Sequence, residues 1–134
     1  MDSSVIVKWV NSVKELLLDK ADLLMEKAQD GKVELIASEL AKYEVGNALF
    51  KKGMSLPQTL SSMSVLYSLP IRFVVEDERL SQSSLEIAYE CRMTYYDAAP
   101  IALALRENAG VVTDNFRHQA KANKVRVIAL EDYS

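Results

Sequence analysis

The stretch YYDAAPIALALRENAGVVTD, residues 95–114, contains a helix, a strand and an acidic residue beside each of them. Residues 98–108 are rich in alanine and leucine and predict a helix that begins after Asp97 as its N-cap. Gly110 follows the helix end, and Val111–Thr113 is a short apolar run that predicts a buried strand. A helix that leads directly into a buried strand is typical of a parallel α/β fold.

The rest of the chain repeats this alternation of helices and strands. Helical spacing, capping serines and helix-ending glycines or prolines predict further helices over residues 13–29, 38–52, 55–69, 78–93 and 116–122. Short apolar runs predict strands over residues 33–37, 71–75 and 125–130. Strands separated by helices of this length favour a mostly parallel sheet with helices on both faces. No linker or repeat interrupts the pattern, so the sequence predicts one α/β domain over residues 1–134.

Composition limits the classes of function. The chain has 134 residues, of which 49% are hydrophobic and 26% charged, as in an ordinary globular domain. The single cysteine, Cys91, excludes an internal disulfide, and the single histidine, His118, argues against a histidine-based metal site. Because there is no membrane-length apolar run and no leader, we expect a cytoplasmic protein without a membrane partner. The net charge of −3 argues against nucleic-acid binding unless some of the acids bind a cation.

Four acidic residues stand at positions where a site is expected. Asp2, Asp97 and Asp114 lie at predicted strand-to-helix turns, which gather at the carboxyl edge of a parallel sheet. Glu44 lies on a helix face that is predicted to point at the core or at a cleft wall. A carboxylate cluster of this kind suits Mg²⁺, which activates water and stabilises a leaving group. The hydroxyls of Ser3, Ser4 and Thr113 adjoin the acids and are candidates to orient carboxylates or metal-bound water.

Each acid also has a simpler interpretation. An aspartate before a helix is a preferred N-cap, so each of the three aspartates is a candidate for capping alone. Glu44 is a candidate for an ion pair with a nearby lysine or arginine. The serines and Thr113 are candidates for capping helices or satisfying turn backbone. The residues alone leave these alternatives open.

Four motifs in order resemble the PIN-domain ribonucleases, and among them the VapC-like toxins of prokaryotic toxin–antitoxin pairs. They are DSSVIVKW at residues 2–9, EVGNAL at 44–49, YDAA at 96–99 and VVTDN at 111–115. The resemblance covers the whole chain. It implies a PIN-like α/β/α sandwich and endonucleolytic cleavage of RNA with Mg²⁺, or alternatively Mn²⁺. It also implies a homodimer and inhibition by a cognate antitoxin protein.

The resemblance implies a role for each motif residue. Asp2 and Asp97 match the principal metal ligands, and Glu44 and Asp114 complete the catalytic acids, with Asp114 as a third metal ligand. Ser4, Thr113 and Asn115 are the supporting residues. The basic residues that follow the site acids are candidates to bind RNA: Lys8, Lys51, Lys52 and Arg117.

The chain departs from the family at two places. The family has a full apolar strand before its first aspartate, whereas here only Met1 precedes Asp2, so the first strand is expected to be truncated. The family also often has Thr-x-Asp at the last motif, and that register places Asn115 rather than Asp114 at the fourth position. The alternative function is therefore a weakened PIN-like module that acts by binding RNA or protein. Apolar excess in residues 16–25 and 56–69 independently favours a homodimer.

Overall fold

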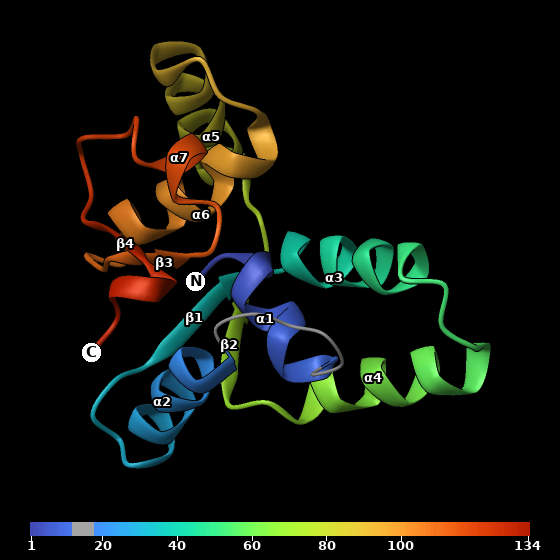
Figure 1. Ribbon diagram of the computed structural model, residues 1–134. Coiled ribbons are helices and arrows are strands. Elements are labelled where there is room, and N and C mark those ends of the chain that lie inside the picture. The colour runs from blue at the N-terminus through green and yellow to red at the C-terminus, as the bar shows by residue number, and fades with distance from the viewer. Residues whose placement is uncertain (12–17) are drawn as a thin grey trace.

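The computed structural model describes residues 1–11 and 18–134 (Figure 1). Its helices are Ser3–Val10 (α1), Leu18–Gln29 (α2), Leu40–Lys51 (α3), Leu56–Ser68 (α4), Glu78–Cys91 (α5), Tyr95–Arg106 (α6) and Phe116–Gln119 (α7). Its strands are Leu35–Ser38 (β1), Ile71–Val74 (β2), Val111–Thr113 (β3) and Val127–Ala129 (β4), and a 3₁₀ helix, Leu130–Asp132 (η1), follows β4. The predicted alternation of helices and strands is therefore present.

Several predicted boundaries are wrong, each for a local reason. Residues 3–10, which include most of the first motif, form α1, a helix that was not predicted from the sequence. The helix predicted from Ala98 begins at Tyr95, because Thr94 rather than Asp97 caps it. The last strand ends at Ala129, where η1 begins. The start of the helix predicted at 13–29 lies outside the described residues, which contain α2 from Leu18.

The strands are parallel, as predicted, but they form two pairs rather than one sheet. Leu35 of β1 pairs with Ile71 of β2, and Val111 of β3 pairs with Val127 of β4. Among the described residues, Met1 and Asp2 bridge β1 and β3. The Met1 amino group donates to the Ile36 carbonyl oxygen at 2.8 Å, and the Asp2 N–H donates to the Val112 carbonyl oxygen at 3.1 Å. The expected central sheet is therefore divided at the place where the first strand was expected to be truncated.

The core is built from helices packed around these strand pairs. Helix α6 is buried along most of its length, as an alanine- and leucine-rich helix requires, and it packs with α5 and β3. Ile6 of α1, Leu49 of α3 and Leu66 of α4 share a second cluster with β1. Val5 of α1 and Leu24 of α2 share a third with Leu130 of η1. Helix α1 joins the last two clusters, so its first turn, where Asp2 and Ser3 lie, is firmly positioned.

Helices α3 and α4 extend from the body as an arm (Figure 1). A capping box fixes the start of α4, since the Ser55 hydroxyl accepts from the Gln58 N–H at 3.4 Å and the Gln58 side chain accepts from the Ser55 N–H at 3.2 Å. Large apolar side chains on the arm are exposed: Phe50, Leu56, Leu60 and Tyr67. Among the residues described, no helix combines the length and apolar character needed to cross a membrane.

Candidate functional site

Asp2 stands at the N-cap position of α1, but its carboxylate does not cap the helix. Its Oδ2 atom accepts the Ser4 hydroxyl at 2.5 Å and the Thr113 hydroxyl at 3.0 Å. Thr113 is the last residue of β3, and Asp2 is only 7% exposed. The capping alternative is therefore wrong for this carboxylate, which two hydroxyls from different segments orient instead.

Asp97 lies in the first turn of α6 and is half-buried. The helix is capped by Thr94, whose hydroxyl accepts the Asp97 N–H at 3.1 Å. Because Thr94 performs the capping, the prediction of Asp97 as N-cap is wrong and the Asp97 carboxylate is left for other contacts. Its Oδ1 atom accepts a long hydrogen bond of 3.4 Å from the Asn115 side-chain amide.

Glu44 projects from α3 toward the two aspartates. Burial, and then the negative charge of Asp2, raise its pKa from 4.5 to about 7; Asp97 adds to this increase, while a hydrogen bond with Ser3 opposes it. Among the residues described, no lysine or arginine forms an ion pair with Glu44. The ion-pair alternative for Glu44 is therefore wrong within that part of the chain, and its close electrostatic neighbours carry the same charge.

Asp114 has a different environment. Its N–H donates to the Ser4 hydroxyl at 3.0 Å, and its carboxylate lies 3.0 Å from the Lys8 Nζ atom. The side chain of Lys8 is only 3% exposed. Lys8 was predicted to line an RNA groove, but the structure buries it on α1, where it neutralises Asp114.

Asn115, not Asp114, has its side chain against Asp97. The Asn115 N–H donates to the Thr113 hydroxyl at 2.8 Å, which turns the residue back toward β3. Asn115 also occupies the N-cap position of α7 without a side-chain capping bond. Of the two residues considered for the fourth position of the site, Asn115 and Asp114, it is therefore Asn115 whose side chain contacts Asp97.

The side chains present have the chemistry of a site for a hard cation. Asp2, Glu44 and Asp97 supply carboxylate oxygens, and Asn115 adds an amide, which is the donor set of Mg²⁺, Mn²⁺ or Ca²⁺ rather than of zinc. Within the described residues, no three such groups converge tightly enough to enclose an ion as they stand. The donors nevertheless fit the group, because burial and the charges of Asp2 and Asp97 raise the pKa of Glu44, and no lysine or arginine among the described residues forms an ion pair with it.

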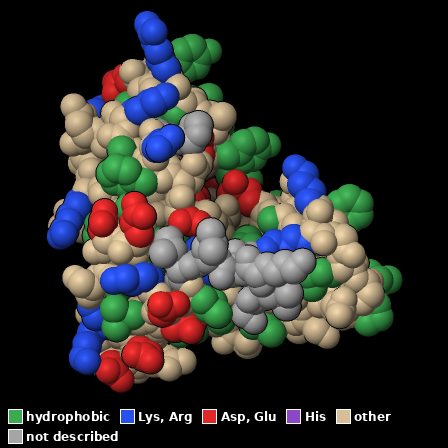
Figure 2. Space-filling view, in the orientation of Figure 1, with side chains coloured by type: hydrophobic (Ala, Val, Ile, Leu, Met, Phe, Trp, Pro, Cys, Tyr) green, Lys and Arg blue, Asp and Glu red, His purple; other side chains and the backbone are tan. Residues whose placement is uncertain are grey.

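A groove of about 710 Å³ runs beside these carboxylates. It is formed by α1, α3 and α6 and lined by Ser3, Leu40, Tyr43, Glu44, Asn47, Ala48, Lys51 and Tyr96. Figure 2 shows it as a hollow between the α3–α4 arm and the part of the molecule that contains α5 and α6, with acidic side chains at its base. The site is therefore open to a large ligand.

Two tyrosines on this groove were missed from the sequence. Tyr43 is 74% exposed and Tyr96 is 56% exposed. Each directly precedes an acid of the cluster, Tyr43 before Glu44 and Tyr96 before Asp97, and that repeated pairing is the signal that would have found them. Exposed aromatic rings at a groove are suited to stacking against planar ligands.

The remaining basic candidates lie on two surfaces. Lys51 lines the groove beside Glu44, and Lys52 is exposed at the end of α3. Arg117 is exposed and lines a separate hollow of about 320 Å³ next to Asp114 and Asn115. Lys51 and Arg117 therefore line different hollows.

Comparison with known proteins identifies the fold. No protein-family model matches the chain, and no curated protein matches it in sequence. A toxin–antitoxin complex from Klebsiella pneumoniae matches with a TM-score of 0.69 at 14% identity, over 96% of this chain and 94% of that one. VapBC2 from Rickettsia felis, bound to a DNA fragment from its promoter, matches with a TM-score of 0.72 at 16% identity, over 95% and 94%. The predicted VapC-like, PIN-like α/β fold is thereby confirmed.

Proposed function

We propose that this chain is the toxin of a toxin–antitoxin pair and acts as a Mg²⁺-dependent endoribonuclease. The observation that carries the proposal is the cluster of Asp2, Glu44 and Asp97, in which the two aspartates raise the pKa of Glu44 and Glu44 lines an open groove. The fold supports the proposal, since a toxin–antitoxin complex and VapBC2 are among the solved structures that match it. Mn²⁺ is the natural substitute for Mg²⁺ with these donors.

In this proposal Asp2 and Asp97 hold the cation, with Asn115 as a neutral fourth partner. The bound ion supplies charge neutralisation at the phosphate and lowers the pKa of water. Ser4 and Thr113 keep the Asp2 carboxylate in one orientation through their hydrogen bonds. Glu44, ionised once a cation offsets its neighbours, orients the attacking water and accepts its proton as the phosphodiester bond breaks.

The groove provides a place for RNA. Lys51 is positioned to contact a backbone phosphate, and Tyr43 and Tyr96 are positioned to stack on bases on either side of the acids. Lys52 and Arg117 extend the basic surface, whereas Lys8 is withdrawn by its pairing with Asp114. The net charge of −3 argued against nucleic-acid binding. In this proposal RNA contacts Lys51, Tyr43 and Tyr96 on the groove, next to the acids. We infer a cytoplasmic site of action, where RNA is available.

The partners we propose are an antitoxin protein and a second copy of the chain. The exposed apolar side chains Phe50, Leu56, Leu60 and Tyr67 lie on helices α3 and α4. Apolar surface of this kind is characteristic of a protein interface. Light scattering tests for the homodimer, and a monomer at micromolar concentration contradicts it.

A second candidate function is a non-catalytic PIN-like binding module. Asn115 stands where a fourth acid is often found, and Lys8 neutralises Asp114, so the cluster has less negative charge than four free acids would give. A module of this kind binds RNA or protein without requiring a cation.

The experiment is an RNA-cleavage assay with and without Mg²⁺, on the parent and on Asp97→Asn. We expect cleavage that requires the ion and is lost in Asp97→Asn, with the fold retained by circular dichroism. The matched control is Asp19→Asn, an acid on α2 that does not line the groove. If the Asp97→Asn variant cuts at the parent rate, the assignment of the site is wrong; if the parent binds RNA without cutting it in any divalent ion, the module is favoured.

A further inference from the structure

Gln119, the last residue of α7, is a polar side chain with no exposed surface. Its Nε2 atom donates to the backbone carbonyl oxygen of Asp97 at 3.2 Å. Its Oε1 atom is also buried and has no hydrogen-bond partner in the part of the chain that the structure describes. Burying an unpartnered amide oxygen costs free energy, so stability alone does not explain why a glutamine stands at this position.

Helix α7 contacts Asp97 at both of its ends. Asn115 precedes the helix and Gln119 ends it, and residues four apart lie on the same side of a helix. The Asn115 side-chain amide donates to the Asp97 carboxylate at 3.4 Å, while Gln119 donates to the backbone carbonyl of the same residue. The side chain and the backbone of Asp97 are therefore both held by one short helix.

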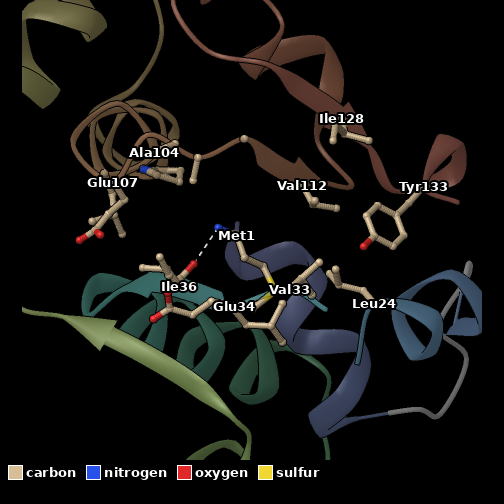
Figure 3. A pocket seen from close by; sticks show the side chains of 15 residues that line it. Met1, Leu24, Val33, Glu34, Ile36, Ala104, Glu107, Val112, Ile128 and Tyr133 are labelled. Atoms are coloured by element: carbon tan, nitrogen blue, oxygen red, sulfur yellow. Dashed lines mark hydrogen bonds between the residues drawn. The ribbon is translucent and has the colours of Figure 1, made fainter. Parts of the chain in front are cut away.

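The first turn of α6, which contains Asp97, is held less firmly by its own helix than a regular turn. Pro100 lies inside α6 and has no N–H, so the carbonyl four residues before it lacks its usual intrahelical donor. On another side of α6, Pro100, Leu103 and Ala104 border an apolar groove of about 200 Å³. Figure 3 shows this groove between Ala104 and Ile36. The position of Asp97 therefore depends on contacts from outside α6, and α7 supplies two of them.

We propose that Gln119 is a positioning residue for Asp97 as a cation ligand, a role that rests on the cation site proposed above. Its hydrogen bond fixes the backbone from which the Asp97 carboxylate projects, and the bond from Asn115 fixes the carboxylate itself. Mg²⁺ demands nearly ideal octahedral geometry, so a small rotation of this turn weakens its binding. Gln119 contacts neither the ion nor the substrate and acts only through Asp97.

The test is Gln119→Met, which keeps the length of the side chain and removes its amide. The substitution removes one hydrogen bond, but it also removes an unpartnered buried oxygen, so we expect a melting temperature no lower than that of the parent. In calorimetric titrations we expect the dissociation constant for Mg²⁺ to rise about tenfold, as when a residue that orients a metal ligand is replaced. The matched control is Gln82→Met, the same change at an exposed residue of α5, which should alter neither quantity.

Titration with Ca²⁺ separates positioning from a general loss of structure. Ca²⁺ tolerates more variable coordination than Mg²⁺, so we expect Gln119→Met to weaken Ca²⁺ binding by less than about threefold. Equal losses for the two ions, or an unchanged affinity for Mg²⁺, overturn the proposal. A melting temperature lower than that of the parent by more than about 5 °C, or a failure to fold, shows that Gln119 serves stability and also overturns it.

A measurement without a cation distinguishes this proposal from the proposed function. In ¹H–¹⁵N spectra of the cation-free protein, the side-chain NH₂ signal of Asn115 reports its contact with the Asp97 carboxylate. We expect Gln119→Met to move this signal toward that of a solvent-exposed asparagine and Gln82→Met to leave it in place. An unmoved signal in Gln119→Met contradicts the positioning of Asp97. A parent that binds no Mg²⁺, although the signal moves, contradicts the cation site and supports the positioning of Asp97.

Discussion

Asp114 and Glu44 are both acids of the predicted site, yet their environments are opposite. Asp114 faces a buried lysine, Lys8, at 3.0 Å, whereas Glu44 is pushed toward neutrality by burial and by the charges of Asp2 and Asp97. In the sequence the two residues look alike, since each is an acid within a recognisable motif. The comparison teaches that the charge of the neighbouring groups decides the effect of a carboxylate. An acid beside a lysine stabilises the fold, and a buried acid beside other acids destabilises it.

The largest effect on stability is expected from Asp114→Asn. The substitution removes the charge of Asp114 from beside the buried Lys8 ammonium, and removing one partner of a buried ion pair is destabilising. We expect a loss of ~2–3 kcal/mol, toward the low end because the Asp114 side chain is itself 37% exposed. Urea unfolding monitored by circular dichroism measures it. A change below ~0.5 kcal/mol means that the pair is not a structural one.

Glu44→Gln is expected to act in the opposite direction. In the absence of divalent cations at pH 7, the change removes a half-buried carboxylate that is repelled by Asp2 and Asp97. We expect a gain of ~1 kcal/mol, well below the full value of the pKa shift, because solvent screens a partly exposed group. The same urea titration gives the number. Destabilisation by this variant removes the basis for an unbalanced cluster.

The pH dependence of stability sharpens the same contrast. The pKa of Glu44 is about 7 when folded and 4.5 when unfolded, so the folded state binds more protons between these values. Stability of the cation-free protein therefore falls as pH rises from about 4.5 to about 7. Glu44→Gln removes this contribution, so the difference between parent and variant grows over that range. If the two proteins keep parallel pH profiles there, the pKa of Glu44 is not raised.

The amino group of Met1 contributes with the opposite sign over a neighbouring range. Burial lowers its pKa from 8.0 to about 6 in the folded state. Its contribution to stability is therefore present above pH 8 and is lost as pH falls toward about 6. Subtracting the parent profile from that of Glu44→Gln cancels this contribution, because both proteins share Met1.

The smallest effects are expected at the two tyrosines. Tyr43→Leu and Tyr96→Leu keep apolar bulk but remove the ring, and each should weaken binding of single-stranded RNA about fivefold to tenfold, while Tyr→Phe at either position should not. Fluorescence anisotropy in Ca²⁺ measures affinity while cleavage is suppressed. Tyr67→Leu on α4 is the control, since Tyr67 is exposed but does not line the groove. Equal losses at all three positions mean that stacking is not specific to the groove.

The elements most reliably predicted from the sequence are those with strong local signals. The capping box at Ser55 and Gln58 and the apolar run of β3 are both present in the structure. Glu44 was predicted to lie on a helix face that points at the core or at a cleft wall, and it lines the groove. These features depend on residues within one helical turn of each other or on the spacing of apolar residues, and both can be read from a single sequence.

Other features of the fold could not be predicted from the sequence, because they depend on contacts between distant segments. Nothing local indicates that Lys8 is buried against Asp114. Capping of α6 by Thr94 is by contrast a local contact, with the Asp97 N–H, and was missed because Asp97 is an equally acceptable N-cap. The sheet is divided between β1 and β3, and long-range hydrogen bonds of Met1 and Asp2 bridge the two strand pairs. Helix α1 was missed because a run of valine and isoleucine at residues 5–7 favours a strand by propensity, and tertiary packing overrides that preference.

The most direct test of the account is a calorimetric titration of Mg²⁺ into the parent, Asp97→Asn and Asp114→Asn at pH 7. The account predicts binding by the parent with release of protons, because an ion beside Glu44 lowers its pKa and displaces the proton it carries. It predicts loss of binding in Asp97→Asn and retention in Asp114→Asn, provided that circular dichroism shows both variants to be folded. A parent that binds no Mg²⁺, or folded variants that lose binding equally, contradicts the claim that Asp2, Glu44 and Asp97 form the cation site.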